Sequence, residues 1–575
     1  MVRSAVSPAT IGPEEFAARV RANLRKQAAD RLIERLWNKD ASLWTSHPDE
    51  QRHILNRLGW LSIASVMEAH VREIEAAAAD IRQAGFTHAI LLGMGGSSLF
   101  SEVCRFTFGV ASGWLDLAVL DSTDPSAIAA AQRRAPIERT LIIVSSKSGA
   151  TTETSALCGY FYEQALATSG SQAGRQFVAI TDAGTPLQRL AEQRRFRYLF
   201  VHGPSTGQDV GGRFSALTYF GLVPVALLGV QVGQLLTRAQ QMLMSCRPTA
   251  PVLSNPAAEL AGCLSEAAAI GRDKMTLLTA PELASFGGWM EQLVAESTGK
   301  SGKGLVPVDR EPLWEPEAYE PDRIFIELQL KSEPDLRLER AVDALAAAGH
   351  PVVRLRWQDR YDLGGEVVRW SAATALTASL MRINAFDEPN VQESKDRTKA
   401  LLDHYSRSYA LPQEPPLVTD KQIAVYGDLP QVAGRSVADA LRGLLAQAKP
   451  NDYLALSSFL PRLPSLDAAV QTLRNRLAKR VRIATTIGYG PRYLHSTGQL
   501  HKGGPETGLF LFLTADDPAD LPVPGEPYTF SVLKQAQGLG DFQALKERHR
   551  RVLRLHLGAS PLDALRALES ALRLS

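Results

Sequence analysis

From about residue 85 onward, short apolar runs alternate with segments of helical periodicity. This alternation is typical of parallel sheets whose strands are joined by helical crossovers. One series of strand candidates extends from Thr87–Leu92 to Arg197–Val201, and a second from Met275–Leu278 to Val352–Trp357. Further candidates, from Gln422–Tyr426 to Arg551–Leu557, follow a Pro-rich link at Leu411–Pro416. The pattern predicts an α/β protein with two doubly wound parallel sheets, preceded by helices and followed by a C-terminal α/β segment.

Four regions are predicted along the 575-residue chain, which is long enough for two or three cores. Residues 14–80 have helical periodicity and predict an N-terminal helical layer. The predicted regions are an N-terminal helical region at 1–75, a first sheet domain at 76–245, a second at 250–410, and a C-terminal α/β segment at 417–575. The last segment is either an additional domain or a rearranged completion of the second one.

Charge and hydropathy exclude several classes of partner. Lys plus Arg number 63 and Asp plus Glu 61, a net charge of +2, so neither nucleic acid nor an acidic membrane is an expected partner. Residues Met1–Pro13 lack the apolar core that a signal peptide needs. The uncharged stretch Phe214–Thr237 contains Pro224 and is predicted to be a buried helix, not a membrane span. We therefore expect a cytoplasmic protein.

The cysteine content predicts neither a disulfide framework nor a zinc site. The cysteines are widely spaced and form no C-x-x-C pair. We expect buried thiols in a reducing compartment. The residues concerned are Cys104, Cys158, Cys246 and Cys263.

A glycine-rich turn, Gly93-Met94-Gly95-Gly96-Ser97-Ser98, directly follows a predicted strand. Such a turn exposes backbone N–H groups at a helix N-terminus, where an anion is stabilised. Ser98 stands where the dinucleotide fingerprint requires its third glycine. The Walker pattern fails as well, because Val294 stands where Gly299-Lys300-Ser301 would require a glycine. The turn is thus either an anion site or simply a tight strand-to-helix corner.

A second loop rich in hydroxyl groups, Ser145–Thr154, follows the predicted strand that ends at Val144. Its serines and threonines offer donors for phosphate oxygens at the start of a helix. An isolated loop of this kind more often only caps its helix. Two such loops on successive strands favour a ligand site, because ligands gather at the carboxyl ends of parallel strands.

In these segments the chain resembles the sugar isomerase (SIS) domain family and, within it, the phosphoglucose isomerases. The Gly-Gly-Ser turn of that family is matched at residues 95–97, and its Ser-Lys-Thr-x-Thr-Thr-x-Glu-Thr loop, more loosely, at 146–154. Ser148 stands where threonine is usual and keeps the hydroxyl. The resemblance implies that the substrate-binding residues are Gly95, Gly96, Ser97, Ser146, Lys147, Ser148, Thr151 and Gln292.

Two further motifs resemble the segments that hold the catalytic residues of this family. Val210–Ser215 is similar to the family's Gly-Gly-Arg-Tyr/Phe-Ser motif, and Gln292–Lys300 to its Gln-x-x-x-Glu-Ser-x-Gly-Lys motif. The resemblance implies that Arg213 faces the reacting carbons and that Glu296 is the catalytic base. Alone, Arg213 would be taken for a surface ion pair and Glu296 for a solvated helix residue. Four motifs in family order make such a coincidence improbable.

The implied reaction explains these residue types. Moving a carbonyl between C1 and C2 of an open-chain sugar phosphate requires a proton to leave one carbon and arrive on the next, which one carboxylate can do. A guanidinium stabilises the charge that develops on oxygen in the enediolate. The resemblance thus implies interconversion of glucose 6-phosphate and fructose 6-phosphate, with no metal and no organic cofactor.

Ring opening needs a further proton shuttle, for which the resemblance points to a lysine and a histidine. Lys395 ends a segment similar to the family's Asn-x-Phe-Asp-x-x-x-Val-x-x-x-Lys. The family's histidine phrase lies between the glutamate and this lysine, where the chain has only His350, in an unrelated context. A similar phrase occurs near the C-terminus, so we expect His495 to open the ring, from a second sheet domain of rearranged order. His501 is the less favoured candidate, and simple packing is an alternative for either histidine.

Other functions and assemblies remain open at this point. The chain also resembles the isomerase half of fused transaldolase–phosphoglucose isomerase proteins, but no transaldolase half is visible in the sequence. A non-catalytic sugar-phosphate sensor would not need Arg213 and Glu296. An aminotransferring isomerase would need a glutaminase domain, of which the sequence shows no sign. Mannose 6-phosphate is a conceivable additional substrate, and the expected state is a monomer or a homodimer.

Overall fold

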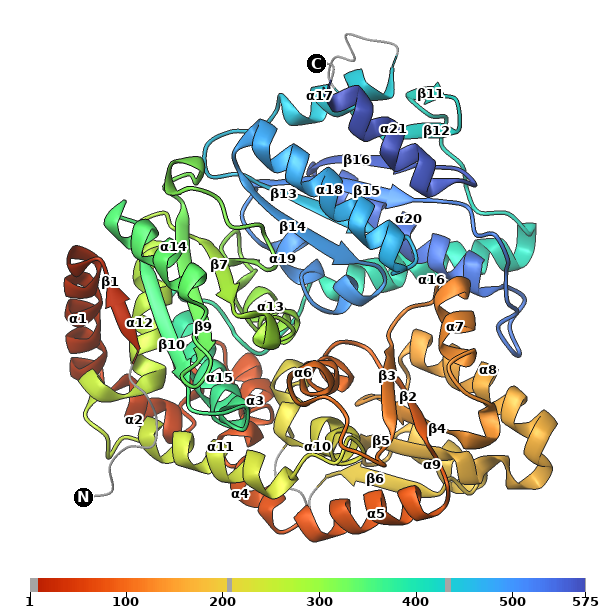
Figure 1. Cartoon of the computed structure of the whole chain (residues 1–575), viewed down its shortest axis with the longest axis horizontal. Coiled ribbons are helices and arrows are strands. Elements are labelled where there is room, and N and C mark those ends of the chain that lie inside the picture. The colour runs from red at the N-terminus through yellow and green to blue at the C-terminus, as the bar shows by residue number, and fades with distance from the viewer. Residues whose placement is uncertain (1–8, 204–208, 430–435, 574–575) are drawn as a thin grey trace. The chain divides into compact units, whose positions relative to one another are not determined.

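The computed structural model describes residues 9–203, 209–429 and 436–573 (Figure 1). The segment Met1–Pro13, in which no signal peptide is predicted, therefore lies partly outside the described residues. The chain forms two compact units. The first unit comprises residues 1–121, 132–316 and 321–387, and the second comprises 122–131, 317–320 and 388–575.

The first unit contains a five-stranded parallel sheet whose spatial order is β3-β2-β4-β5-β6. Numbered along the chain, these strands have the order 2-1-3-4-5, a doubly wound topology whose switch point lies between β2 and β4. The central strand β4 is buried along its whole length, as expected when helices cover both faces. The strands are β2 (His88–Leu92), β3 (Asp116–Leu120), β4 (Thr140–Ser145), β5 (Phe177–Asp182) and β6 (Tyr198–His202).

Helices connect these strands as the sequence pattern predicts. The connecting α-helices are α6 (Leu99–Phe108), α7 (Pro125–Gln132), α8 (Thr152–Ser169) and α9 (Pro186–Gln193). Two short 3-10 helices carry glycine motifs, η3 (Gly95–Ser97) and η7 (Gly212–Leu217), and α10 (Tyr219–Ala226) follows. Residues 214–228 are buried as predicted, but Gln231, Gln234 and Thr237 are exposed. The stretch forms the end of η7, α10 and the start of α11 (Val232–Cys246), not the one helix predicted.

A second sheet in the same unit repeats this topology. Its order is β8-β7-β9-β10-β1, in which the first four strands are parallel and β1 is antiparallel. Numbered along the chain, the parallel strands again have the order 2-1-3-4, so the predicted repetition of whole sheet domains is present. The strands are β7 (Lys274–Thr279), β8 (Val306–Val308), β9 (Arg323–Leu330), β10 (Val352–Trp357) and β1 (Thr10–Gly12).

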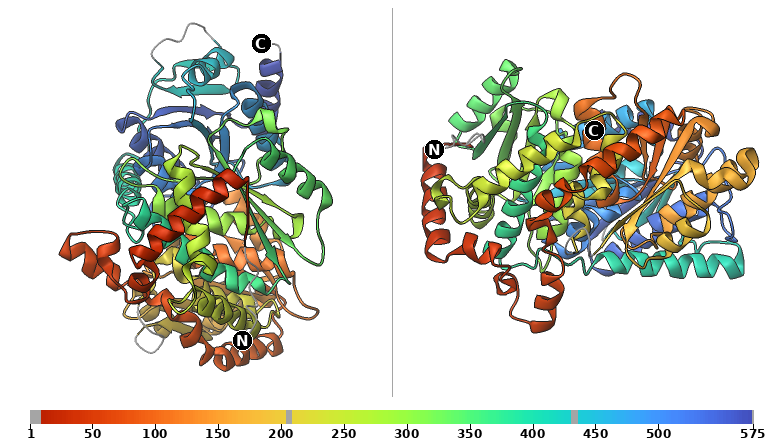
Figure 2. Two further views of the ribbon diagram at one scale, coloured as in Figure 1. Left: turned by 90° about the vertical axis from the view of Figure 1, so that its left-hand side faces the viewer. Right: turned by 90° about the horizontal axis from the view of Figure 1, so that it is seen from below.

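The N-terminal region is helical as predicted, with one exception. Strand β1 precedes the helices and pairs with β10. The sequence did not predict this strand, because a segment of three residues is too short to show a periodicity. Helix α1 then packs against α12, as Figure 2 shows. The helices of this region are α1 (Glu14–Ala29), α2 (Leu32–Trp37), α3 (Pro48–Leu55), α4 (Ile63–Glu68) and α5 (Val71–Gln83).

A single continuous apolar core joins the two sheets of the first unit. Helix α15 (Asp362–Leu380) lies at its centre and packs against α11, α12 (Pro256–Ala269) and α13 (Phe286–Thr298). Trp370 on α15 is fully buried and lies 6.2 Å from Phe286 on α13, between ring centroids. Helix α13 shares this core and also contacts η3, η7 and α6, which follow or connect strands of the first sheet.

The second unit is built on a third sheet, with the order β14-β13-β15-β16-β12-β11. Its first four strands are parallel and repeat the order 2-1-3-4, and the last two are antiparallel. The C-terminal segment is thus an additional sheet, and the expected rearrangement of the second sheet is not found. The strands are β11 (Val418–Asp420), β12 (Ile423–Gly427), β13 (Tyr453–Ser458), β14 (Ala484–Tyr489), β15 (Gly508–Thr514) and β16 (Arg551–His556).

The helices of the second unit begin before the predicted boundary. Helix α16 (Val391–Ser408) falls in this unit, although the sequence pattern placed it in the region ending at residue 410. It packs lengthwise against α20, and that contact explains the difference. The other helices are α17 (Val437–Leu445), α18 (Pro464–Val481), η11 (Arg492–His495), α19 (Gly498–Gly503), α20 (Phe530–Glu547) and α21 (Pro561–Arg573).

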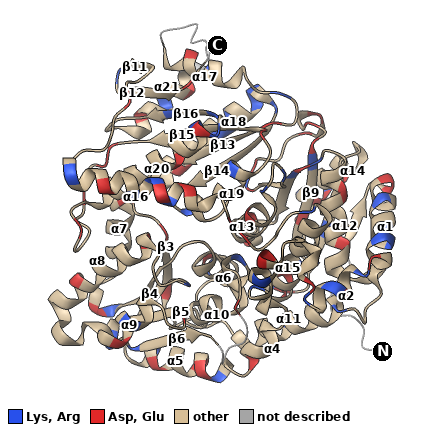
Figure 3. Cartoon of the chain, turned by 180° about the vertical axis from the view of Figure 1, so that it is seen from behind, with Lys and Arg blue, Asp and Glu red and all other residues tan. Residues whose placement is uncertain are grey.

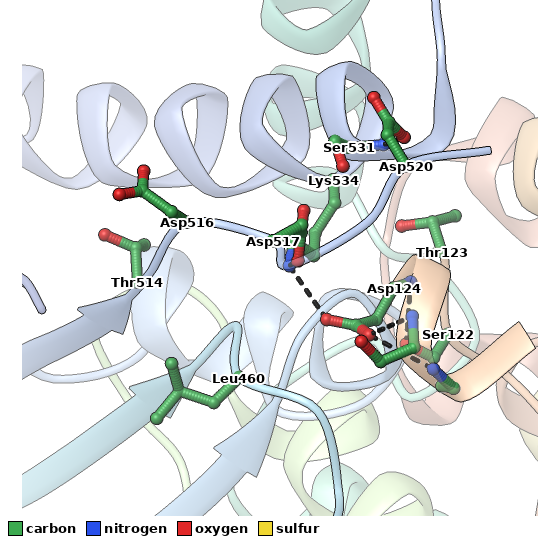
Figure 4. Close-up of polar contacts among 12 residues, drawn as sticks. Ser122, Thr123, Asp124, Leu460, Thr514, Asp516, Asp517, Asp520, Ser531 and Lys534 are labelled. Carbon is green, nitrogen blue, oxygen red and sulfur yellow. Dashed lines mark hydrogen bonds and ion pairs between the residues drawn. The ribbon is translucent and has the colours of Figure 1, made fainter. Parts of the chain in front are cut away.

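Residues 122–131, which follow β3, also belong to the second unit. Lys534 on α20 donates to Asp124 at 2.8 Å and also pairs with Asp517, as Figure 4 shows. One turn along α20, the side-chain carbonyl of Gln537 accepts from Thr123 at 2.7 Å. Lys534 and Asp124 are both buried. The ion pair of Lys534 with Asp124 and the hydrogen bond of Thr123 with Gln537 therefore attach this segment to α20.

Charged residues and cysteines are distributed as the composition suggests. Lys and Arg are interspersed with Asp and Glu along the ribbon of both units (Figure 3). The four cysteines are buried, and burial raises the pKa of each thiol, to about 12 for Cys158 and Cys246. Within the described part of the chain, no helix has both the length and the hydropathy for a membrane crossing.

Candidate active site

The glycine turn and the hydroxyl loop meet at the switch point of the first sheet. The carboxyl ends of β2 and β4 are hydrogen-bonded neighbours there. A Cβ on Gly93 would lie 3.0 Å from the carbonyl oxygen of Ser145, so the two loops pass each other in close contact. Ser145 Oγ donates to the carbonyl of Ser97 at 2.8 Å. This is the position at which doubly wound sheets bind their ligands.

The two glycine motifs are packed directly on each other. Gly95 has a φ of +52°, which favours glycine. A Cβ on Gly96 would lie 1.9 Å from the carbonyl oxygen of Gly212, a distance that no side chain could occupy. Ser215 fastens the contact, because its hydroxyl lies 2.7 Å from the carbonyl of Gly212 and 3.2 Å from that of Gly96. The glycines therefore allow η3 and η7 to touch.

The hydroxyl loop folds back on itself at the start of α8. The hydroxyls of Ser146 and Thr151 lie 2.9 Å apart, and Gly149, with a φ of +63°, makes the turn between them. Ser148 is exposed at the tip of the loop. Hydroxyls and the N-terminus of an 18-residue helix are thus gathered at one place, which suits an anion.

Lys147 differs from its neighbours in the loop. Its ammonium group pairs with both Asp182 and Asp209. Burial raises the pKa of Asp182, against the opposing effect of Lys147. The lysine is therefore engaged by carboxylates in this structure, and a phosphate contact from Lys147 would require it to change partners.

Arg213 is buried, and its guanidinium donates three hydrogen bonds to neighbouring protein groups. Its Nε donates to Ser297 Oγ at 2.9 Å, and Nη2 donates to the carbonyls of Ala385 and Asp387 at 2.6 and 2.9 Å. Nη1 lies 3.5 Å from Oε1 of Glu296. The guanidinium is thus held from behind, and Nη1 is the nitrogen that faces the glutamate.

Glu296 lies on α13, one turn after Gln292. Gln292 Nε2 donates to Glu296 Oε2 at 3.2 Å, so the two side chains share a helix face. The Glu296 side chain is 10% exposed and that of Arg213 is 3% exposed. Helix α13 contacts both η3 and η7, so the four motifs of the sequence converge in one region.

The structure shows one further group of residues that the sequence reasoning left without a role. Lys300 Nζ donates to the carbonyl and to the carboxylate of Asp387, at 2.6 and 2.8 Å. Asp387 and Ala385 are the residues whose carbonyls hold Arg213. Ser297 and Lys300 lie inside the motif Gln292–Lys300, so the motif carried this signal, but only tertiary contacts show what the two residues hold.

Lys395 and His495 lie in the second unit. Lys395 is exposed on α16, and His495 ends η11, which follows β14. Helix α16 and η11 are in contact with each other. The two residues predicted to open the ring are therefore carried by adjoining elements, and their roles stay predictions.

His501 and His350 are poor candidates for proton transfer. His501 is 3% exposed and packs among the rings of Tyr453, Tyr493 and Phe510, and burial lowers its pKa to about 3. A histidine in this state stays neutral and is shielded from solvent. His350 is also buried, against Phe325, and burial lowers its pKa. His495 is thus the favoured histidine.

The arrangement supports acid–base chemistry on an anionic ligand. A carboxylate and a guanidinium 3.5 Å apart can move a proton and stabilise the negative charge that results. Among the described residues, no cluster of three or more histidine, cysteine, aspartate or glutamate side chains could hold a metal ion.

Comparison with known proteins shows what the chain is similar to. Residues 64–306 match the family model of phosphoglucose isomerase. A probable glucose-6-phosphate isomerase of Haloarcula marismortui is 29% identical over 416 residues, which are 65% of this chain and 92% of that protein. The chloroplastic glucose-6-phosphate isomerase 1 of Arabidopsis thaliana is 29% identical over 55% of this chain, which matches 57% of that protein.

Solved structures show the same fold. A hypothetical protein of Thermus thermophilus superposes with a TM-score of 0.59 at 23% identity, covering 68% of this chain and 99% of that one. A glucose-6-phosphate isomerase from Chlamydia trachomatis has a TM-score of 0.53 at 17% identity, covering 68% of this chain and 86% of that one.

The fold is α/β with parallel, doubly wound sheets, as in these two solved structures. The match to the family model of phosphoglucose isomerase covers residues 64–306, which include η3, η7 and α13.

Proposed function

We propose that the protein is a glucose-6-phosphate isomerase, which interconverts glucose 6-phosphate and fructose 6-phosphate through a cis-enediolate. The observation that carries the proposal is the buried Arg213 beside Glu296, 3.5 Å apart, on elements that contact the Gly-Gly-Ser turn. The curated relatives that share the matched region carry this activity in their names. The protein would act in glycolysis and gluconeogenesis in the cytoplasm.

In the proposed mechanism, the hydroxyls of Ser146, Ser148 and Thr151 bind the phosphate at the N-terminus of α8. Glu296 removes the proton from C2 of the open-chain aldose and returns it to C1. Arg213 stabilises the enediolate oxygen through Nη1, while its other nitrogens remain bound to the protein. Because no hydride leaves the substrate, the step needs no redox cofactor.

Ring opening is assigned to His495 with Lys395. His495 would take the proton of the anomeric hydroxyl and deliver it to the ring oxygen as the bond between that oxygen and the anomeric carbon breaks, and Lys395 would stabilise the ring oxygen as it becomes a hydroxyl. The assignment of His495 over His501 is supported by the burial and the low pKa of the latter. Mannose 6-phosphate as an additional substrate, and a monomeric or homodimeric state, belong to the proposal as open alternatives.

The test is to mix purified protein with fructose 6-phosphate in the presence of EDTA and to follow the formation of glucose 6-phosphate. Turnover that EDTA does not reduce is the expected result. Binding of the sugar phosphate without turnover would instead identify a sensor. Offering mannose 6-phosphate in the same assay tests the second substrate, and sedimentation of the protein gives its oligomeric state.

A further inference from the structure

A buried carboxylate, Asp541 on α20, joins three elements of the second unit. Its Oδ1 accepts from Lys502 Nζ on α19 at 2.6 Å and from Ser394 Oγ on α16 at 2.8 Å. Its Oδ2 accepts from the hydroxyl of Tyr493 on η11 at 2.7 Å. Asp541 is 0% exposed and Lys502 is 1% exposed. One side chain thus receives three hydrogen bonds from three different segments.

Two of these partners adjoin the residues assigned to ring opening. Ser394 immediately precedes Lys395, and Tyr493 lies two residues before His495. A second link ties the same region together, because Asn390 and Gln499 exchange hydrogen bonds of 2.9 and 2.8 Å. The start of α16 is therefore fixed to the segment that follows β14.

The protonation states suit this role. Burial acts to raise the pKa of Asp541, but Lys502, Tyr493 and Ser394 together hold it below its ordinary value, so the carboxylate is ionised. Burial and the nearby Asp541 raise the pKa of Tyr493, so its hydroxyl stays a donor. Charge-assisted hydrogen bonds of this kind are stronger and shorter than neutral ones.

Stability alone does not account for the ion pair. Removing two charges from water is costly, and their mutual attraction often does no more than offset that cost, so apolar residues of similar size commonly serve as well. What an ionised carboxylate provides here, and an apolar side chain could not, is a defined position for Ser394 and Tyr493. The geometry therefore favours a positional role for Asp541.

We propose that Asp541 is a positioning residue for ring opening: through Ser394 and Tyr493 it holds Lys395 and His495 at the separation that proton transfer to a cyclic sugar phosphate requires. This inference rests on the proposed function. The inference goes beyond the proposed function because it assigns a role to Asp541, a fully buried residue outside the proposed substrate contacts.

The experiment separates ring opening from isomerisation. Exchange NMR measures how fast the protein interconverts the α and β anomers of glucose 6-phosphate, and a coupled assay measures isomerisation. The test variant is Ser394→Ala/Tyr493→Phe, which removes both hydrogen bonds but leaves the Lys502–Asp541 pair intact. We expect its anomer interconversion to fall at least tenfold and isomerisation of the cyclic substrate to fall with it, with KM little changed.

Two further variants control for folding. Asp541→Leu/Lys502→Met removes both buried charges together, so it leaves no unpaired ion, and it should show the same loss. Asp452→Asn alters a buried carboxylate of the same unit, paired with Arg551 at 2.6 Å before the start of β13, and should leave anomer interconversion unchanged.

Each outcome decides the question. If Ser394→Ala/Tyr493→Phe melts like the wild type and interconverts anomers at the wild-type rate, the positioning role is wrong while the proposed function stands. If the wild type itself interconverts neither anomers nor isomers, the proposed function falls and the positioning role with it. A variant that loses isomerisation but keeps anomer interconversion would also contradict the inference, because the defect would then lie at the Glu296 step.

Discussion

Nη1 of Arg213 lies 3.5 Å from Oε1 of Glu296, although the two residues are 83 positions apart and lie on different elements. The guanidinium reaches this place because Ser297 and two backbone carbonyls bind its other nitrogens. The arginine is thus part of the scaffold and part of the site at once. Substitutions of Arg213 and of Glu296 are therefore expected to have different effects.

Glu296→Gln should abolish turnover and leave ligand binding largely intact. The amide keeps the size of the side chain but cannot accept a proton from carbon, and loss of a general base commonly lowers kcat by about 10²–10⁴-fold. The measurement is kcat for fructose 6-phosphate together with calorimetric binding of the same ester. Normal turnover by this variant would remove the proposed base.

Arg213→Lys should lower kcat about 100-fold, because loss of one preorganised donor to a developing oxyanion has an effect of that size. Lysine keeps the charge but cannot bind Ser297, two carbonyls and an enediolate oxygen in one plane. Arg238→Lys is the matched control, since Arg238 pairs with Asp359 away from the motifs. Equal activity of both variants would contradict the assigned role of Arg213.

Gly96→Ala should destabilise the first unit by about 1–3 kcal/mol, because the added methyl group would overlap the carbonyl of Gly212 and force η3 away from η7. Gly233→Ala serves as the control. Its Cβ would meet only Val71 at 3.8 Å, within a helix where alanine is preferred over glycine. Thermal melts of the two variants test the prediction, which fails if Gly96→Ala melts at the wild-type temperature.

His501 should make the stability of the second unit sensitive to acid. The folded protein keeps this histidine neutral down to a pH of about 3, whereas the unfolded chain binds a proton near pH 6.5. The unfolded state therefore gains stability as pH falls through this window, by up to about 1.4 kcal/mol per pH unit. The stabilisation is fully present above pH 6.5.

Urea unfolding of the wild type and of His501→Phe at pH 7.5, 6 and 4.5 measures this effect. Phenylalanine suits the surrounding aromatic rings and does not titrate, so the variant should lose less stability between pH 7.5 and 4.5 than the wild type. Parallel loss in both proteins would show that His501 is not the group responsible.

Lys534→Met should destabilise the second unit by about 3–5 kcal/mol, because Asp124 and Asp517 would remain buried without their cation. Lys546→Met on the same helix removes a partly exposed pair with Glu414 and should cost at most about 1 kcal/mol. Chemical unfolding of the two variants compares these losses. Equal stability would mean that Lys534 does not anchor residues 122–131.

The parallel sheets and the motifs could be predicted from the sequence, because both depend on local patterns of residues. Each predicted strand from Thr87–Leu92 to Arg551–Leu557 has its counterpart in the structure, displaced by a few residues at most. The apolar runs report burial directly, and the glycine motifs report close backbone contacts such as that of Gly96 with Gly212. Arg213 and Glu296 were likewise recognisable from their motifs.

Features that depend on contacts between distant segments could be known only from the folded chain. The additional third sheet follows from how strands pair, and a strand such as β14 carries no mark of its neighbours in its own residues. The burial of His501 is imposed by the surrounding rings, and the proposal of His495 over His501 rests on that burial. Lys534 holds residues 122–131, which lie 403 or more positions earlier in the chain. The sequence could not reveal this contact, because an aspartate and a lysine are ordinary surface residues until folding buries them together.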